Sequence, residues 1–479
     1  MSKTIIVSVG PDETRMALLE NGELMETALE RYAGTQIVGN IYKGKIKNML
    51  PGMQAAFVDI GREKNAFLYI GKTYPYLGGS AEKGMMLTEG QEIIVQVTKD
   101  AIGTKGPRVV TEWNLPGRYL VLLPTAKHIG ISRRIESEEE RERLRLIAEE
   151  ACPGGMGLIV RTVAEGKTAQ DLQKDVTYLY NLSSALSARA KRSSAPTLLY
   201  RDVDLIIRLV RDMFDDRVDE FIIDQQEAYN RVRDLVQLSD PDLLSRVHLY
   251  QSDKDIFAHY DVKPQLEELR QREVRLKCGG YLVIDRTEAL TVIDVNTGKF
   301  VGNTNLAATV FQTNCEAAKE IARQIRLRDL GGMIIIDFID MNQEEHRQAI
   351  LALLQEQLHR DRTRNNVYGF TALGLVEMTR KKVRQDMDGT MYETCSFCEG
   401  RGRLLSPETM VIRINRQLRN IAAGQRSSGN FVLQAPQRLA SVLSAEWLAA
   451  MERDLSLSLK IEFRADLQPE VFTILRCKE

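Results

Sequence analysis

Two runs of aliphatic residues in this sequence each end in carboxylates. One is 290–296 (LTVIDVN), which carries Asp294, and the other is 333–340 (MIIIDFID), which carries Asp337. Such runs predict strands that are buried on both faces, where an unpaired charge is costly. Because carboxylate oxygens are the ligands that hard divalent cations prefer, the pattern predicts a metal ion held between the two strand ends.

A carboxylate-held Mg²⁺ suits the hydrolysis of a phosphodiester. The ion activates a water molecule and relieves the charge on the phosphoryl oxygens. We expect Asp294 and Asp337 to bind it, Asn296 to orient the water or the scissile phosphate from the same side of its strand, and Asp340 to lie just outside this first set. Mn²⁺ accepts the same oxygen ligands, so the sequence does not rank the two metals. The alternative is that residues 294–298 form only an Asx-rich turn and that Asp337 merely ends a strand.

The residues between the two acids predict the element that brings them together. The stretch 306–330 is amphipathic, so the order is strand, helix, strand. Neighbouring strands of one sheet lie ~5 Å apart, which is close enough for two carboxylates to share one ion.

Other catalytic chemistries lack their residues. The five histidines, His128, His248, His259, His346 and His359, show no spacing that suits an acid–base pair. The sequence also contains neither a phosphate-binding P-loop motif nor a Gly-x-Ser-x-Gly nucleophile elbow. Metal-assisted hydrolysis is therefore the favoured chemistry.

Composition indicates a multidomain α/β protein of the cytoplasm. The chain has 479 residues, which predicts two to four domains, and its 43% hydrophobic and 27% charged residues are ordinary for a globular protein. No apolar stretch approaches the ~18 residues that would span a bilayer, so no membrane contact is expected. The six cysteines are too scattered for a secreted disulfide framework.

The C-terminal region has an uneven charge distribution. No acidic residue occurs between Glu408 and Glu446. Five arginines fall inside this stretch: Arg413, Arg416, Arg419, Arg426 and Arg438. The pattern favours local contacts with phosphates. A solvated helix face whose arginines pair with acids elsewhere explains it equally well.

Residues 37–118 consist of short β runs broken by glycines, which predicts a small β-barrel. Within it, 54–61 (QAAFVDIG) and 66–69 (AFLY) resemble the aromatic-bearing strands of an OB-fold RNA-binding module. Stacking of a base on an exposed ring contributes ~1–3 kcal/mol for any base. Phe57 and Phe67 are the candidate rings and Lys105 is a candidate phosphate contact. The alternative is that both rings fill the barrel.

The segment after the barrel predicts a phosphate pocket. Helices are expected at 136–151 and 172–191, and an apolar run, 157–160, precedes Arg161 and Thr162. A guanidinium group binds phosphate oxygens in a bidentate way, and a threonine hydroxyl beside it can complete a site for a terminal phosphate.

Cys395 and Cys398 have the spacing of half a zinc knuckle. Structural zinc takes four ligands, and no second pair lies nearby in the sequence. The simplest solution is that two chains each donate both thiolates to one shared ion, which would make a homodimer. A redox dithiol and unligated buried thiols are the alternatives.

Together these motifs resemble the ribonuclease E/G family of bacterial endoribonucleases. The resemblance runs from 38–44 (VGNIYKG) to the cysteine pair, and its most specific part is 326–332 (RLRDLGG), which leads into the second acid-tipped strand. The absence of a long disordered C-terminal arm is typical of the shorter members of the family.

The resemblance implies a multidomain α/β organisation that the hydrophobic periodicity does not show. It combines an RNase H-like fold, an inserted OB-fold, a catalytic subdomain like that of DNase I, a zinc-link and a small C-terminal domain. The expected boundaries are 1–35 and 198–274 for the RNase H-like parts, 36–118 for the OB-fold, 119–197 for a 5′-phosphate sensor, 275–390 for the catalytic subdomain, 391–405 for the zinc-link and 406–479 for the C-terminal dimerisation domain.

The resemblance also assigns roles to residues and a function. Asp294 and Asp337 match the metal ligands, with Asn296 beside them, and Cys395 and Cys398 match the shared zinc ligands. The residues that match the sensor pocket are Gly117, Val121, Arg161 and Thr162. The expected activity is Mg²⁺-dependent cleavage of single-stranded RNA with a preference for 5′-monophosphate ends. The expected processes are maturation of ribosomal RNA 5′ ends and turnover of messenger RNA. The expected assembly is a homodimer or a larger oligomer. The rivals are a non-catalytic RNA-binding protein of ribosome assembly and a metal-dependent DNA nuclease.

Overall fold

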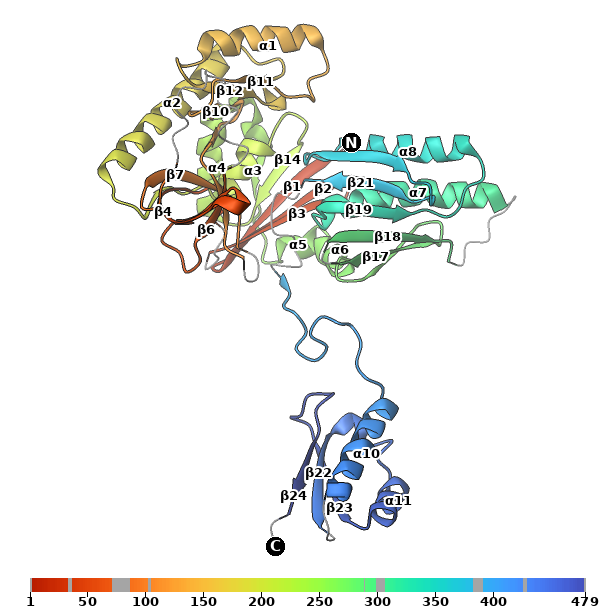
Figure 1. Cartoon of the computed structure of the whole chain (residues 1–479). Helices are drawn as coiled ribbons and strands as arrows, with labels where there is room; N and C mark the ends of the chain where they lie inside the picture. Colours follow the sequence, from red (N-terminus) through yellow and green to blue (C-terminus); the bar gives the residue numbers. More distant parts are fainter. Residues whose placement is uncertain are drawn as a thin grey trace. The chain divides into compact units, whose positions relative to one another are not determined.

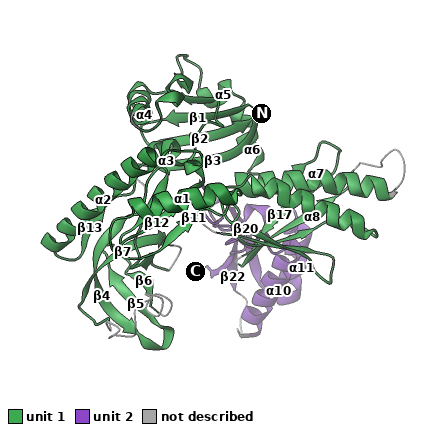
Figure 2. Cartoon of the chain, turned by 90° about the horizontal axis from the view of Figure 1, so that it is seen from above, with its two compact units in different colours: residues 1–390 green, residues 391–479 purple. Residues whose placement is uncertain are grey.

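The computed structural model describes residues 2–32, 37–70, 87–101, 105–287, 289–298, 306–381, 391–424 and 429–477. The chain divides into two units, residues 1–390 and 391–479 (Figure 2). Among the residues within these ranges, no helix combines the length and the apolar character needed to cross a bilayer.

The first sheet of unit 1 has five strands in the order β15-β14-β1-β2-β3 (Figure 1). β1 runs parallel to β14 and antiparallel to β2. Asn21 and Gly22 adopt positive φ angles of 52° and 82° between β2 and β3, which is the conformation that a tight two-residue hairpin turn requires. One face of the sheet packs on α3 and α4, and the other on α5 and α6. The bounds are β1 Lys3–Val9, β2 Glu13–Glu20, β3 Glu23–Arg31, β14 Glu220–Ile223, β15 Val247–Leu249, α3 Leu205–Asp212, α4 Gln226–Ser239, α5 Ile256–His259 and α6 Val262–Glu268.

The predicted β-barrel is present between β4 and β8. Five strands form a closed ring, because β4 pairs with both β5 and β7, and the ring continues through β6 and β8. The strands are β4 Ile41–Leu50, β5 Ala55–Asp59, β6 Ala66–Tyr69, β7 Glu92–Lys99 and β8 Arg108–Val110. A further strand, β13 (Thr197–Tyr200), returns from later in the chain and pairs with β4.

A third sheet follows the barrel in the order β11-β12-β10-β9, and the helices α1 and α2 share its hydrophobic core. The helices begin with side-chain caps, Ser137 for α1 and a Thr168–Asp171 capping box for α2. β9 lies within the range expected for the barrel, but it pairs with β10 instead. The bounds are β9 Leu115–Pro116, β10 Leu120–Leu123, β11 Ile129–Ile131, β12 Gly157–Val160, α1 Glu138–Ala151 and α2 Ala169–Arg192.

The fourth sheet carries both acid-tipped strands, in the order β16-β17-β18-β19-β21-β20. The amphipathic stretch between the two acids forms α7, and α7 and α8 run alongside the sheet (Figure 1). Their apolar side chains form one core with residues such as Ile293, Ile334 and Ile336. The bounds are β16 Glu273–Arg275, β17 Tyr281–Arg286, β18 Leu290–Asn296, β19 Gly332–Asp337, β20 Asn365–Phe370, β21 Val376–Arg380, α7 Leu306–Leu327 and α8 Glu344–His359.

The prediction that both acid-tipped strands are buried on two faces is wrong. Residues alternate between buried and half-buried along β18, and on β19 Met333 and Asp337 are exposed while Ile334 and Ile336 are buried. Both α7 and α8 contribute to the core on the same side of the sheet, which leaves the opposite side open. The acids therefore stand on an accessible face.

Unit 2 contains a three-stranded sheet in the order β23-β22-β24, which shares one core with α10 and α11. Trp447 of α11 donates a hydrogen bond to Asn415 of α10, with 3.2 Å between the Nε1 and Oδ1 atoms. The bounds are α10 Pro407–Gly424, β22 Asn430–Pro436, α11 Ala445–Leu455, β23 Ser458–Arg464 and β24 Thr473–Arg476.

Candidate functional site

The two acids predicted to bind metal are direct neighbours. β18 and β19 are parallel, and Asp294 lies opposite Asp337 in their register. Burial and the nearby carboxylates of Asp294 and Asp340 raise the pKa of Asp337 above its ordinary value. Three carboxylates that repel one another in this way are suited to a divalent cation, which would relieve the repulsion. Within the described ranges, however, no three acidic, histidine or cysteine side chains already form a complete metal site.

Asn296 has a more specific position than the sequence predicts. Its side-chain amide donates a hydrogen bond to the Asp294 carboxylate, with 2.8 Å between the Nδ2 and Oδ2 atoms. Both residues are on the open face of β18, because they are two positions apart. Asn296 therefore fixes the orientation of the Asp294 carboxylate and leaves its other oxygen available to a ligand.

A buried asparagine that the sequence analysis missed supports the loop after β19. Asn314, on α7, is fully buried, and its side chain both donates to the carbonyl of Ile339 and accepts from the N–H of Ile339, at 2.8 and 3.1 Å. This pair of bonds fixes the backbone next to Asp340. The signal in the sequence is a polar residue on the apolar side of the amphipathic helix, which at a buried site needs a partner.

The rings of Phe57 and Phe67 lie outside the barrel core. They are directly opposite each other on β5 and β6, are half-buried, and make an edge-to-face contact with 6.1 Å between centroids. The barrel interior is filled by other residues, including Val58 and Leu68. The alternative that these phenylalanines fill the barrel is therefore wrong.

The strand register extends this aromatic pair into a row across the barrel. Asn48 lies opposite Phe57, Arg108 opposite Phe67, and Lys99 opposite Arg108. Asn48, Arg108 and Lys99 are all exposed. Residues that are paired in register share one face of a sheet, so two half-exposed rings are flanked by two cations and an amide. The sequence analysis missed Arg108 and Lys99, because strand pairing rather than sequence proximity brings them to the rings.

Lys105 is exposed and precedes β8. It lies two residues before Pro107, whose carbonyl accepts a hydrogen bond from the N–H of Phe67. The structure thus places Lys105 at the edge of the row, beside the strand that carries Arg108.

Three of the four predicted sensor residues meet at one end of β12. The Arg161 guanidinium donates to the carbonyl of Gly117 at 2.7 Å and forms an ion pair with Asp212, also at 2.7 Å. Thr162 follows directly, and its hydroxyl lies 2.8 Å from the hydroxyl of Ser132. Val121 lies on β10, the strand next to β12.

The backbone around Gly117 is held by a buried acid. Asp175 of α2 accepts hydrogen bonds from the N–H groups of Arg118, Tyr119 and Leu120, and burial raises the pKa of its carboxyl group. A Cβ atom at Gly117 would lie 2.5 Å from the oxygens of Asp175, so this close approach requires glycine.

Asp212 is the partner of Arg161 that the sequence does not reveal. It also accepts two hydrogen bonds from Arg211, each 2.9 Å long. Burial alone would raise the pKa of Asp212, but Arg211 and Arg161 outweigh it and lower the pKa. Both arginines thus pair with the Asp212 carboxylate, and the carboxylates of Asp175 and Asp202 also lie close enough to act on Arg161 and Arg211, respectively.

Cys395 and Cys398 lie close together at a turn of the chain. The N–H groups of Cys398 and Phe397 and the Cys398 thiol interact with the Cys395 sulfur and hold the pKa of Cys395 below its ordinary value. Glu399 and Gly400 follow with positive φ angles, which turn the chain back. Both cysteines are free thiols, Cys395 exposed and Cys398 half-buried, so the pair is open to a further ligand.

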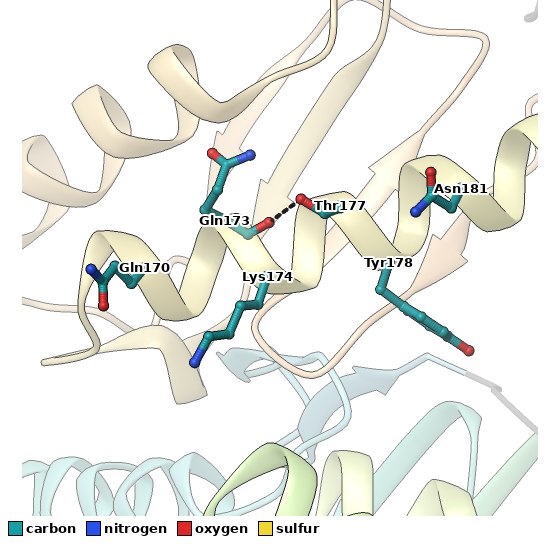
Figure 3. Close-up of a pocket in the computed structure, with 6 residues that line it drawn as sticks. All are labelled: Gln170, Gln173, Lys174, Thr177, Tyr178 and Asn181. Atoms are coloured by element: carbon teal, nitrogen blue, oxygen red, sulfur yellow. Dashed lines mark hydrogen bonds between the residues drawn. The ribbon is translucent and has the colours of Figure 1, made fainter.

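Two hollows on unit 1 contain none of the predicted site residues. One is an open depression on α2, lined by Gln170, Gln173, Lys174, Thr177, Tyr178 and Asn181 (Figure 3). The other has a volume of about 1120 Å³ and is lined mainly by residues of β3, α6, β16 and α7. Neither brings together groups for catalysis.

Comparison with known proteins gives consistent matches. Residues 114–383 match the model of the ribonuclease E/G family. The chain is 41% identical to ribonuclease G of Salmonella typhimurium (strain SL1344) and to ribonuclease G of Escherichia coli (strain K12), in each case over 99% of this chain and 100% of the relative. It is 36% identical to ribonuclease E of Haemophilus influenzae (strain ATCC 51907 / DSM 11121 / KW20 / Rd), over 93% of this chain and 48% of that relative.

Proposed function

Since this chain belongs to the ribonuclease E/G family, and is therefore an endoribonuclease that hydrolyses RNA, we propose that it cleaves single-stranded RNA with a Mg²⁺ ion held by Asp294 and Asp337. The observation that carries this proposal is the register of β18 and β19, which sets the two carboxylates side by side on an accessible face. Among the described residues, Asp294, Asp337 and Asp340 offer carboxylate oxygens at this point, and such ligands fit Mg²⁺.

The chain's own residues orient the proposed metal ligands and concentrate negative charge around them. Asn296 holds one Asp294 oxygen, and Asn314 fixes the loop that carries Asp340. When bound, the ion would activate a water molecule and neutralise charge on the phosphoryl group. Water adds to phosphorus and the bond to the 3′ oxygen breaks, which leaves a 5′-phosphate and a 3′-hydroxyl.

The RNA-binding surface of the proposed enzyme is the row across the barrel. Bases stack on Phe57 and Phe67, and Arg108, Lys99 and Lys105 contact phosphates. Stacking does not select a base, so the barrel holds single strands of many sequences. We propose ribosomal RNA precursors and messenger RNA as the substrates.

We also assign two of the sheets to subdomains. The first sheet, with strand order β15-β14-β1-β2-β3, is the RNase H-like part, and the sheet with β18 and β19 is the DNase I-like part.

The region around Arg161 is the proposed sensor of a 5′-monophosphate. Arg161 lies at the end of β12 with its guanidinium between the Gly117 carbonyl and Asp212, and the Thr162 hydroxyl lies beside it. A terminal monophosphate carries more charge than an internal phosphodiester, so it competes for these donors most effectively.

One experiment tests metal use and end recognition together. An oligoribonucleotide with either a 5′-monophosphate or a 5′-hydroxyl is incubated with the enzyme, with and without a chelator. We expect faster cutting of the phosphorylated RNA, no cutting of either RNA in the chelator, and a ratio of the two rates that falls to about 1 in Arg161→Ala.

Arg145→Ala is the matched control for this experiment. It removes an arginine from an exposed ion pair with Glu142 on α1 and should keep the full preference. Unchanged cutting in the chelator would contradict the metal proposal, and an unchanged preference in Arg161→Ala would contradict the sensor. Equal cutting of single-stranded DNA would instead favour the rival DNA nuclease.

We also propose that Cys395 and Cys398 of two chains share one zinc ion. The pair supplies two thiolate ligands of the four that structural zinc takes. Cys395→Ser should therefore lower both the mass measured by sedimentation and the zinc content, whereas Cys477→Ser, which removes an exposed thiol from the same unit, should change neither. A zinc-free dimer of Cys395→Ser would argue against the shared ion.

A further inference from the structure

The exposed face of α10 carries three arginines without partners. Met410, Ile414 and Leu418 are fully buried in the core of unit 2, and this spacing turns the opposite side of the helix to solvent. Arg413, Arg416 and Arg419 are exposed there. Within the described part of the chain, none of their three side chains forms a hydrogen bond or an ion pair.

Four acids of unit 2 have partners other than these arginines. Glu462 pairs with Lys460, Asp466 with Arg464, and Glu470 with Arg401, at 2.9, 2.5 and 3.1 Å respectively. Glu452 accepts a hydrogen bond from the N–H of Leu459. These four acids therefore do not neutralise the charge of the three α10 arginines.

The other two arginines of this acid-free stretch have different positions. Arg438 donates to the carbonyls of Pro469 and Leu405 at 2.8 and 2.9 Å, so its role is to join segments of the unit. Arg426 lies outside the described residues. The open positive charge is thus concentrated on a single helix face.

We propose that this α10 face binds the sugar–phosphate backbone of the substrate RNA. Arg413, Arg416 and Arg419 are spaced three residues apart, so successive guanidinium groups lie near one another along the helix. Arginine is the side chain best suited to phosphate oxygens, and a polyanion supplies the missing counter-charge. The proposal rests on the RNA substrate of the enzyme and adds a contact that does not take part in the chemistry.

A second copy of the chain is a poorer occupant of this face. A two-fold contact places the same surface of each copy together, so arginines would meet arginines with no acid between Glu408 and Glu446 to compensate. Exposed Ile412 provides little apolar area for such a contact.

The test compares two triple variants of the full chain, each with Asp294→Asn to prevent cutting. The face variant carries Arg413→Gln, Arg416→Gln and Arg419→Gln. The matched control loses three arginines from other elements of unit 2 through Arg453→Gln, Arg464→Gln and Arg476→Gln. The affinity for a long single-stranded RNA is measured over a range of salt concentrations.

For the long RNA, we expect the face variant to bind about 10- to 100-fold more weakly at low salt, with a salt slope that is smaller by about 2, since each phosphate contact on a single strand contributes ~0.7. The control should bind this RNA as tightly as Asp294→Asn alone, with an unchanged salt slope. Equal weakening in both triple variants, or none in either, would overturn the proposal. A lower sedimentation mass of the face variant would show that α10 joins copies of the chain instead. Cutting of the RNA by these samples would count against the catalytic role of Asp294 and not against this surface.

Discussion

Asp294→Asn is expected to reduce RNA cleavage by at least about 10³-fold while RNA binding stays close to that of the wild type. The substitution keeps the shape of the side chain and its contact with Asn296, but it removes the negative charge that faces Asp337. Burial and the charge of Asp294 both raise the pKa of Asp337. Loss of the Asp294 charge therefore relieves repulsion and should not unfold the sheet. Asp337→Asn should have the same effect.

The measurement is single-turnover cleavage, together with an RNA-binding titration. Asp285→Asn is a matched control, because it changes an acid of the same sheet, on β17, that forms an exposed ion pair with Arg272. Such surface pairs contribute only ~0–1 kcal/mol, so this variant should cut RNA normally. If either Asp294→Asn or Asp337→Asn retained a large fraction of wild-type activity, the metal site would have to be placed elsewhere.

Arg380→Leu is expected to be the most destabilising single change in the catalytic sheet. The guanidinium is almost completely buried and donates to Asp361, to Asp329 and to the carbonyl of Leu330, with shortest distances of 2.6, 2.6 and 3.0 Å. Asp361 is itself only 3% exposed. Removal of one partner from a buried ion pair leaves an uncompensated charge and typically costs about 3–5 kcal/mol.

This loss should appear as a fall of about 6 °C or more in melting temperature, recorded by circular dichroism. Glu377→Gln on the same strand is the control, since Glu377 is exposed. An unchanged melting temperature in Arg380→Leu would mean that the carboxylates find other partners. Because Arg380 is paired with Gly332 at the start of β19, cleavage is expected to fall together with stability.

The parts of the fold that follow from local pattern could be predicted. The aliphatic runs that end in Asp294 and Asp337 and the amphipathic helix between them specify strand, helix and strand, and the parallel register then makes the acids neighbours. The side of the sheet that is covered could not be predicted, because it depends on α8, which packs on the same side as α7. Runs that look buried on two faces are in fact buried on one.

In the candidate sites, too, local pattern predicts some residues, whereas others depend on distant parts of the chain. Phe57 and Phe67 follow from sequence. The rest of their row, Asn48, Arg108 and Lys99, is brought to them by three further strand pairings around the ring. Likewise, Arg161 is recognisable after its strand, whereas Asp212 reaches it from the end of α3. Long-range pairings of this kind have no local signal in a single sequence.

The uncovered side of the catalytic sheet has a consequence for the kind of cut that the enzyme makes. Asp337 and Met333 are both exposed on the face of β19 that α7 and α8 do not cover. A polymer can be laid across such a surface at any point along its length, and neither terminus has to be threaded. Scission in the middle of a chain, as opposed to stepwise trimming from an end, is therefore the outcome that this geometry permits.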